Sequence, residues 1–313
     1  MRTIVCKAKL TDKQADELGG VFLNESHYDV LIRGESVRGL REDGSTLFVI
    51  VKNHIKPSLC VTARNALRLA ARVSNNRGTA AGNVTKQDVL RLNQEIAEKG
   101  GKSFYTVTKT GMLTKVLQDG TISKTSYAKP VESGIAGFFD RSPRNPYCRL
   151  TSYNAEHADK FQSAVPFIQA VNSAFKEQEP VRYESQMKMI RETNRDFVIP
   201  DTAFTTITVN RNFRTACHKD AGDYHDGFGV LSVLQTGKYH GGFFVIPKYR
   251  VAVDLRTTDV LLADVHEWHG NTEITPITEN WERISCVFYY REKMHECGSA
   301  AEELETAKRF RKI

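Results

Sequence analysis

Three residues with metal-ligating side chains stand at a spacing that suits a single metal site. One residue separates His218 from Asp220, and His269 follows about fifty residues later. Alternate residues of a β-strand point the same way, so His218 and Asp220 would leave one face together while Lys219 faces away. A second imidazole from a distant strand would complete a 2-His-1-carboxylate set, which leaves coordination positions open on Fe(II) for a co-substrate and dioxygen. The spacing therefore predicts a non-haem iron site.

A candidate co-substrate site follows the second histidine. Arg283 lies in a strand-like run, and its planar guanidinium suits bidentate pairing with the distal carboxylate of 2-oxoglutarate. Ser285, two residues on, shares that strand face and can add a hydroxyl contact. Arg214, four residues before His218, is a further candidate for the co-substrate, although a DNA phosphate or a structural carboxylate would be an equally natural partner for it.

Short strand-like runs surround these residues. They are rich in β-branched and aromatic residues and cover residues 203–210, 228–235, 242–246, 249–254, 259–265 and 283–290. Turn-forming residues separate them, among them Gly237, Gly241, Pro247 and Asn271. Short strands at short intervals predict a barrel or a sandwich.

Three segments of this region resemble a known family. They are Asn-Phe-Arg-Thr-Ala-Cys-His-Lys-Asp-Ala-Gly-Asp at 212–223, Gly-Gly-Phe-Phe-Val-Ile-Pro at 241–247 and His-Glu-Trp-His-Gly-Asn-Thr at 266–272. Together they resemble the TET/JBP family of 2-oxoglutarate/Fe(II)-dependent DNA dioxygenases, especially its short phage and bacterial members. The resemblance covers roughly residues 200–297. It implies an α+β fold with a double-stranded β-helix (jelly-roll) core buttressed by helices, and a need for Fe(II), 2-oxoglutarate and dioxygen.

Two histidines compete for the place of the distal ligand. His269 is preferred, because Gly270-Asn271-Thr272 after it resembles the strand-mouth signature of the family, and because a short loop would join it to the strand of Arg283. His266 would then be a surface imidazole or one that orients a ligand. Asp223, His225 and Asp226 are interpreted as groups at the rim of the pocket.

The resemblance also implies the reaction. It is hydroxylation of the 5-methyl group of a pyrimidine in DNA, and the target nucleotide would have to leave the base stack to reach a buried iron. Oxidation of 5-methylcytosine to 5-hydroxymethylcytosine is favoured over that of thymine to 5-hydroxymethyluracil, because the likeness is to members without the additional DNA-binding domain of the JBP type. A hydroxylase of an amino acid, peptide or small metabolite is one alternative, and a non-catalytic DNA-binding module is another. The aromatic candidates for stacking on the base are Tyr224, Phe228, Tyr239 and Trp268.

Positive charge is concentrated in the first half of the chain. Residues 1–150 hold 24 Lys and Arg against 14 Asp and Glu, whereas residues 151–313 hold 20 against 23. Such a field attracts a phosphate backbone, although a solvated helix face would explain it equally well. Arg64, Arg68 and Arg72 recur every four residues along a predicted helix at 61–73, and this basic stripe could lie along DNA. The glycines of the loop at 74–82 permit close approach to a phosphate, but an inserted strand would also fit there.

The remaining patterns define three regions. Helices are predicted at 88–99, 154–176 and 182–193, a hairpin at 103–123 with its turn at 118–121, and a charged helix or frayed tail at 300–313. Phe161, Ile168, Val171 and Phe175 recur at helical spacing and predict a core-facing stripe. The expected division is a basic N-terminal α/β region that contacts DNA at 1–132, a double-stranded β-helix domain at 133–297, and a charged C-terminal tail at 298–313.

The cysteines and the apolar residues of the sequence indicate the cellular compartment. Six cysteines are scattered without any C-x-x-C pair, so neither a zinc cluster nor a disulfide framework is expected, and reduced thiols suit an Fe(II) enzyme. No apolar run reaches the roughly 18 residues of a membrane span, and the first ten residues contain lysines where a signal peptide needs apolar ones. A cytoplasmic location is expected, in the host cytoplasm for a phage-encoded protein, with no membrane partner. The oligomeric state is left open.

Overall fold

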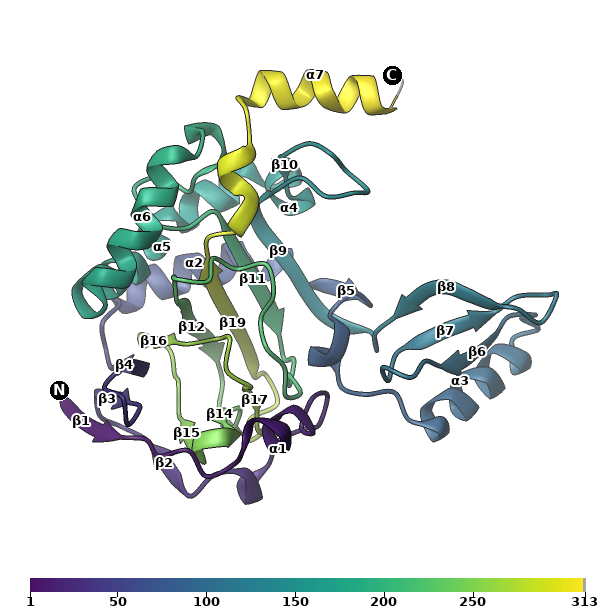
Figure 1. Ribbon diagram of the computed structural model, residues 1–313, viewed down its shortest axis with the longest axis horizontal. Coiled ribbons are helices and arrows are strands. Elements are labelled where there is room, and N and C mark those ends of the chain that lie inside the picture. Colours follow the sequence, from purple (N-terminus) through teal and green to yellow (C-terminus); the bar gives the residue numbers. More distant parts are fainter. Residues whose placement is uncertain (312–313) are drawn as a thin grey trace.

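The computed structural model, which describes residues 1–311, is built around two β-sheets (Figure 1). The larger sheet has the strand order β1-β3-β4-β16-β12-β19-β11-β9-β10, with β5 paired to β9. Its strands are β1 (Arg2–Val5), β3 (Val37–Leu40), β4 (Thr46–Val51), β16 (Val260–Ala263), β12 (Gly229–Thr236), β19 (Glu282–Tyr289), β11 (Thr206–Arg211), β9 (Val131–Phe139), β10 (Arg149–Leu150) and β5 (Arg72–Ser74). The smaller sheet consists of β17 (Gly270–Asn271), β14 (Phe244–Ile246), β15 (Val251–Val253) and β2 (Val30–Ile32) in that order.

Apolar side chains fill the space between the two sheets. Leu231 and Val233 from the larger sheet share one buried cluster with Phe244 and Val251 from the smaller sheet. Their burial follows from the β-branched and aromatic composition that marked these runs as strands. The two packed sheets, with helices on the outside, confirm the α+β double-stranded β-helix predicted from the sequence.

Helices cover the outer face of the larger sheet. They are α2 (Pro57–Leu67), α4 (Ser152–Glu156) and α5 (Ala158–Gln178), and α6 (Pro180–Glu192) packs on α5. The predicted stripe of Phe161, Ile168, Val171 and Phe175 is buried against this sheet. Burial of each such side chain stabilises the folded protein by about 1.5–3 kcal/mol. Among residues 1–311, none of the helices combines the length and the apolar character that a bilayer crossing requires.

Strand β19 links this core to the site. Ile284, Cys286 and Phe288 point into the cluster beneath the helices. The alternate residues, Arg283, Ser285, Val287 and Tyr289, line the cavity on the other face. The core-facing residues therefore fix β19 in place, and the strand presents Arg283 and Ser285 to the cavity from its other face.

The first fifty residues add strands to both sheets. β4 pairs with β16 in the larger sheet, and β2 runs parallel to β15 in the smaller one. β1 and β3 complete that edge of the larger sheet. The division between residues 132 and 133 remains a prediction, since strands from both sides of it share the sheets.

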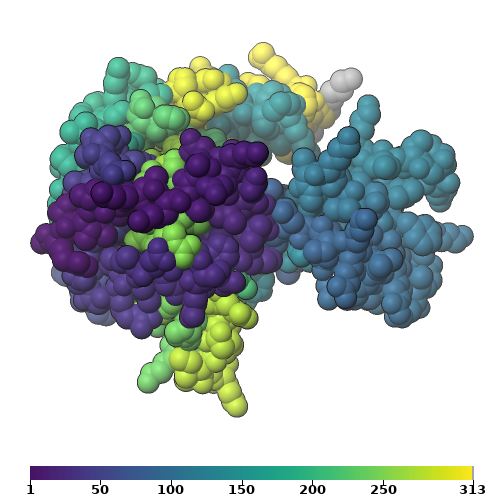
Figure 2. Space-filling view, turned by 60° about the horizontal axis from the view of Figure 1, so that its bottom comes forward, coloured from purple at the N-terminus to yellow at the C-terminus, as the bar shows by residue number. Residues whose placement is uncertain are grey.

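Residues between the core strands form a projecting lobe (Figures 1 and 2). It contains α3 (Lys86–Glu98) and a three-stranded sheet of β6 (Phe104–Val107), β7 (Leu113–Val116) and β8 (Ile122–Tyr127). The turn predicted at 118–121 joins β7 to β8, and the Asp119 carboxylate caps it by accepting from the Thr121 N–H at 2.9 Å. Eight Lys and Arg stand against four Asp and Glu in residues 83–130, so the lobe carries a net positive charge.

The three arginines of the predicted basic stripe form ion pairs within the protein and do not share one helix, which corrects the predicted helix at 61–73. Arg64 and Arg68 form ion pairs with the buried Glu282 at 2.8 and 2.9 Å, and Arg72 pairs with Glu156. The helix ends at Leu67, and Arg72 already belongs to β5, the inserted strand that the following loop allowed. These arginines hold α2 and β5 against the sheet, because their charges are satisfied there.

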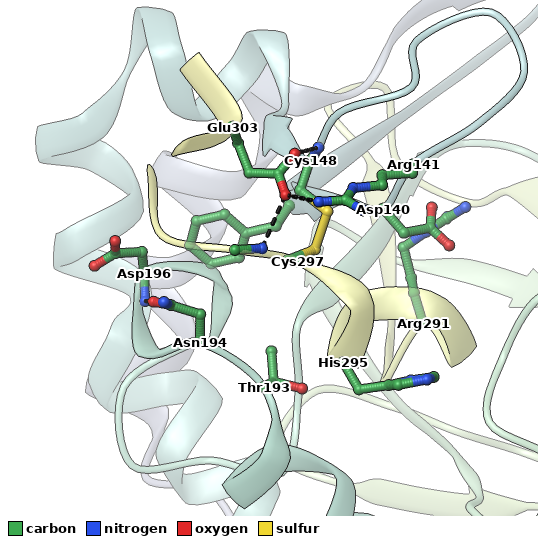
Figure 3. The surroundings of a disulfide bond; sticks show 12 residues. Asp140, Arg141, Cys148, Thr193, Asn194, Asp196, Arg291, His295, Cys297 and Glu303 are labelled. Carbon is green, nitrogen blue, oxygen red and sulfur yellow. Dashed lines mark hydrogen bonds and ion pairs between the residues drawn. A yellow bond between two sulfur atoms is a disulfide. The ribbon is translucent and has the colours of Figure 1, made fainter. Parts of the chain in front are cut away.

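Two cysteines form a disulfide that the sequence did not indicate. Cys148, just before β10, is bonded to Cys297, which precedes α7 (Ala300–Arg311), while Cys6, Cys60, Cys217 and Cys286 are free and buried. The separation of 149 residues explains why no spacing pattern revealed the pair. Beside the bond, Glu303 accepts from Arg141 and from the Cys148 and Gly298 N–H groups (Figure 3). The predicted tail is thus tied to the domain up to Arg311, and its last two residues lie outside the described part of the chain.

Candidate metal centre and co-substrate site

His218, Asp220 and His269 come together at one point. Their ligand atoms all lie within 4.8 Å of one another. The two histidines form an antiparallel bridge with N–H···O distances of 2.8 and 2.9 Å, which brings their ring centroids to 4.5 Å. The Asp220 N–H donates to the Val265 carbonyl at 3.0 Å. Backbone hydrogen bonds between two distant segments therefore hold the three predicted ligands in place.

The segment that carries the first two ligands is not a regular strand, which corrects the local prediction. β11 ends at Arg211, and the next residue, Asn212, has a φ of 47°, in the left-handed region that turns the chain. Beyond it, the N–H groups of Ala216 and Cys217 bond to carbonyls of residues 80 and 21 rather than to a neighbouring strand. The spacing of two residues still places both ligands on the same side.

Hydrogen bonds fix the tautomers of the two imidazoles. Nδ1 of His218 lies 2.8 Å from the Ala216 carbonyl, and Nδ1 of His269 lies 3.0 Å from the Glu267 carbonyl. Because a carbonyl only accepts, each Nδ1 carries the proton and each Nε2 keeps its lone pair for a metal.

The pKa values of the ligand groups also bear on metal binding. Burial, together with the neighbouring His218, lowers the pKa of His269 to about 4, so this ring is neutral near pH 7. Nε2 of His218 lies 3.4 Å from the Asp220 carboxylate; this pairing raises the pKa of His218 and keeps the pKa of Asp220 below its ordinary value, although burial acts to raise it, so a metal would replace the proton of this pair. Two imidazole nitrogens and one carboxylate form a donor set that fits Fe(II).

His266 takes no part in this cluster. Its Nδ1 lies 3.5 Å from the Asp264 carboxylate, and its ring stacks on His225 with the centroids 5.0 Å apart. The structure thus brings His269, rather than His266, to the first pair.

Arg283 and Ser285 lie where the co-substrate prediction requires. Both line the cavity, and Arg283 is only 3 % exposed. Its Nη2 donates to the Gly242 carbonyl at 3.3 Å, while its buried Nε has no hydrogen-bond partner within residues 1–311. A buried donor without a partner costs about 1–3 kcal/mol, so this guanidinium is prepared to receive a carboxylate.

Arg214 lies elsewhere. Its Nη2 donates to the Leu23 carbonyl at 2.6 Å, and its guanidinium stacks over Phe22 with 5.0 Å to the ring centroid. It is not among the residues that line the cavity. The structure therefore gives Arg214 a role in packing the N-terminal segment against the domain and does not bring it to the co-substrate site.

The cavity beside the triad has a volume of about 700 Å³ and is lined by Arg77, which the sequence did not indicate, and by Asp223, which was interpreted as a rim group together with His225 and Asp226; the last two do not line it. Arg77 donates to the Gly134 carbonyl at 2.9 Å, its buried Nε has no partner among residues 1–311, and burial lowers its pKa. Asp223 has one buried carboxylate oxygen that is likewise without a partner there. Burial and the nearby Asp220 raise the pKa of Asp223.

The aromatic lining of the cavity also differs from expectation. Tyr224, Phe228, Tyr239 and Trp268 are not among the lining residues, whereas Phe139, Tyr153, Phe213 and Tyr289 are. Trp268, for example, donates to Asp16 at 2.7 Å on the surface. Phe244 lines the cavity as well, and three of the five lining aromatics, Phe139, Tyr153 and Tyr289, come from segments outside the clearest motifs, so no local pattern had indicated them.

The fold and the site define an oxygenase of the 2-oxoglutarate/Fe(II) class. Residues 134–292 match the oxygenase domain of the 2OGFeDO superfamily, Tet_JBP. This match spans half of the chain, and the protein therefore belongs to that family. It confirms the resemblance found in the sequence, the enzyme class and the two expected cofactors, Fe(II) and 2-oxoglutarate.

Two curated relatives are similar to about half of this chain. The chain is 40% identical over 168 residues to thymine dioxygenase JBP1 of Trypanosoma brucei brucei, covering 52% of this chain and 20% of the relative. It is 36% identical over 174 residues to thymine dioxygenase JBP1 of Leishmania braziliensis, covering 54% and 21%. The chain thus spans about a fifth of the length of these relatives. A solved structure of NgTET1 in complex with 5mC DNA aligns over 96% of this chain and 100% of that one, with a TM-score of 0.49 and 12% identity.

Proposed function

We propose that the protein hydroxylates the 5-methyl group of a pyrimidine in DNA. The observation that carries the proposal is the cavity beside His218, Asp220 and His269, whose volume of about 700 Å³ leaves room for a substrate as well as a co-substrate. Bound Fe(II) and 2-oxoglutarate would supply the oxidising chemistry, in which dioxygen and 2-oxoglutarate convert a methyl group to a hydroxymethyl group, with succinate and CO2 as co-products.

The residues of the chain would position the reactants. Arg283 and Ser285 would hold the distal carboxylate of the co-substrate from β19, and their core-facing neighbours fix that strand. The triad lies in a buried cavity, so the target nucleotide must leave the duplex to reach it. Its base would then lie among Phe139, Tyr153 and Tyr289, whose rings offer apolar surface for stacking.

The charged groups in the cavity are suited to the polar edge of a pyrimidine. Asp223 offers an acceptor and Arg77 offers donors, and both have atoms without partners in residues 1–311. The edge of 5-methylcytosine presents an amino donor beside two acceptors, N3 and O2, which would meet both groups. We therefore place 5-methylcytosine first. Thymine is the second candidate, because the relatives are named thymine dioxygenases and its N3–H could also reach a carboxylate.

DNA would extend beyond the cavity. The projecting lobe carries exposed basic residues that include Lys86, Arg91, Lys102, Lys109 and Lys124. Such a surface gives sequence-independent, salt-sensitive affinity for a phosphate backbone. In this proposal, the lobe, which lies within the N-terminal region at 1–132, supplies the DNA contact that the sequence assigned to that region, while Arg64, Arg68 and Arg72 are engaged in ion pairs.

Asp223→Asn is expected to change the choice of base. Asparagine always presents a donor beside its acceptor, so it would pair with O4 of thymine and would weaken acceptance from the amino group of 5-methylcytosine. A single neutral hydrogen bond contributes about 0.5–1.5 kcal/mol, and the ratio of hydroxymethylcytosine to hydroxymethyluracil should fall by about two- to tenfold. Asp226→Asn, an exposed carboxylate in the same loop, is the matched control. An unchanged ratio in Asp223→Asn would remove this residue from base selection.

Nucleoside mass spectrometry tests the function itself. The protein is incubated with Fe(II), 2-oxoglutarate, oxygen and a duplex that contains 5-methylcytosine and thymine in equal numbers. Predominance of 5-hydroxymethylcytosine supports the proposal in full, and predominance of 5-hydroxymethyluracil moves the substrate to thymine. Succinate without an altered base would point to a hydroxylase of another substrate. DNA binding without either product would point to a binding module.

A further inference from the structure

Three arginines gather around two aromatic rings beside the cavity. The guanidinium of Arg149 lies over Phe139, 4.7 Å from the ring centroid, and 6.0 Å from the centroid of Tyr147. Arg291 lies over the same Phe139 at 5.6 Å, and Arg311 lies over Tyr147 at 5.4 Å. Residues from β9, β10 and both ends of the C-terminal segment thus meet in one cluster, here called the arginine cluster: Arg149, Arg291 and Arg311.

The charges of this cluster are not balanced. Asp140 pairs with Arg291 at 2.8 Å, but no carboxylate of residues 1–311 forms an ion pair with Arg149 or Arg311. Nη1 of Arg149 is buried and has no hydrogen-bond partner in the same part of the chain. Burial lowers the pKa of Arg149, and the positive charges of Arg291 and Arg311 act in the same direction, while Tyr147 and Asp140 oppose it. An anion at this point would satisfy the donor and relieve the repulsion between like charges.

The cluster adjoins the cavity of the site. Arg291, a member of the cluster, and Phe139, over whose ring Arg149 lies, both line that cavity. Thr151, Ser152 and Tyr153, which follow Arg149 closely in the chain, line it as well. An anion held by Arg149 would therefore lie at the edge of the space in which the substrate base is proposed to bind.

The surroundings hold Arg149 firmly. It pairs with Phe139 across β9 and β10, and its chain neighbour Cys148 is bonded to Cys297 (Figure 3). Glu303 accepts from the Cys148 N–H at 2.7 Å and from Arg141 at 2.5 Å. Rigid support of this kind lowers the entropic cost of binding a ligand, so the geometry is that of a prepared site and not of a mobile basic surface.

We propose that the arginine cluster binds a phosphodiester of the substrate DNA, next to the nucleotide that enters the cavity. The planar guanidinium of Arg149 suits a phosphate through paired N–H donors, and its position at the cavity edge places that phosphate beside the target. This inference rests on the proposed function, because it takes the occupant of the cavity to be part of a DNA strand. A bound phosphodiester would fix the position of the DNA strand relative to the cavity, which base contacts alone would not do.

Equilibrium binding of a short methylated duplex to Arg149→Gln tests the site. The variant should bind about tenfold more weakly, as expected for the loss of one charge-assisted pair, and the slope of log affinity against log salt should fall by about one. Affinity for 2-oxoglutarate should not change. Arg191→Gln, the same change on the exposed outer helix α6, should leave the DNA affinity and the salt slope unchanged. Unaltered DNA affinity and salt slope in Arg149→Gln would overturn the proposal.

A second measurement alters the DNA. A set of duplexes, each with one uncharged methylphosphonate linkage near the target base, should reveal a single linkage whose neutralisation weakens binding about tenfold in the unmutated protein. Neutralisation of the same linkage should not weaken DNA binding by Arg149→Gln. Equal binding of every duplex by the unmutated protein would overturn the proposal, as would inorganic phosphate that binds at Arg149 without competing with DNA. If no base is oxidised, the proposed function fails, while these binding results still decide the phosphate site.

Discussion

Asp220→Ala is expected to abolish both hydroxylation and succinate formation. It removes the only carboxylate of the predicted iron site, and His218 and His269, held together by their backbone bridge, would remain. Loss of an outer partner of a metal ligand typically costs about 10–100-fold, so loss of a ligand should exceed that range. The measurement is anaerobic Fe(II) binding followed by turnover on DNA, with circular dichroism to confirm that the variant is folded.

The matched control is Asp226→Ala, which removes an exposed carboxylate six residues further on. It should bind Fe(II) and turn over like the unmutated protein. Full activity of Asp220→Ala would contradict the assignment of the metal site. Equal loss of activity in the control would mean that the loop tolerates no change, and that the first result says nothing specific about iron.

Arg283→Lys is expected to raise the KM for 2-oxoglutarate about tenfold to a hundredfold. Lysine keeps the positive charge but loses the planar fork that can hold a carboxylate with two parallel hydrogen bonds. At a buried position, 3 % exposed, the remaining ammonium would also be poorly solvated. Steady-state kinetics with varied 2-oxoglutarate, at saturating DNA and iron, measures the effect.

Ser285→Ala provides the graded comparison. It removes one neutral hydroxyl from the same strand face, which corresponds to about 0.5–1.5 kcal/mol, so its KM should rise by only about two- to tenfold. A KM that does not respond to Arg283→Lys, with kcat reduced instead, would show that this guanidinium acts on something other than the carboxylate of the co-substrate.

Much of the core was predictable because its signals are local. Six strands of the two sheets, β11, β12, β14, β15, β16 and β19, coincide with the predicted β-branched and aromatic runs, whereas the strands of the first fifty residues were not predicted. The helix α5 buries the stripe of Phe161, Ile168, Val171 and Phe175. The three ligand candidates came from residue type and spacing, and the residues after His269 separated it from His266. Each of these inferences depends on neighbours in the sequence, which a single chain displays directly.

What the sequence did not reveal depends on contacts between distant segments. Arg64 and Arg68 formed a convincing basic stripe, yet Glu282, over two hundred residues away, neutralises both. Nothing near Arg77 indicates that its side chain enters the cavity, and nothing in the cysteine spacing pairs Cys148 with Cys297. Arg214 illustrates the opposite error. Its proximity to His218 in the sequence suggested that it binds the co-substrate, but its side chain donates to the Leu23 carbonyl.

The most direct test of the whole account is to count products in one reaction. Succinate and 5-hydroxymethylpyrimidine are measured together after incubation of the protein with Fe(II), 2-oxoglutarate, oxygen and a methylated duplex. The account predicts one succinate for each hydroxymethylated base during the first turnovers, and neither product without Fe(II). Hydroxymethylated base formed without succinate, or succinate released at the same rate whether or not DNA is present, would contradict it.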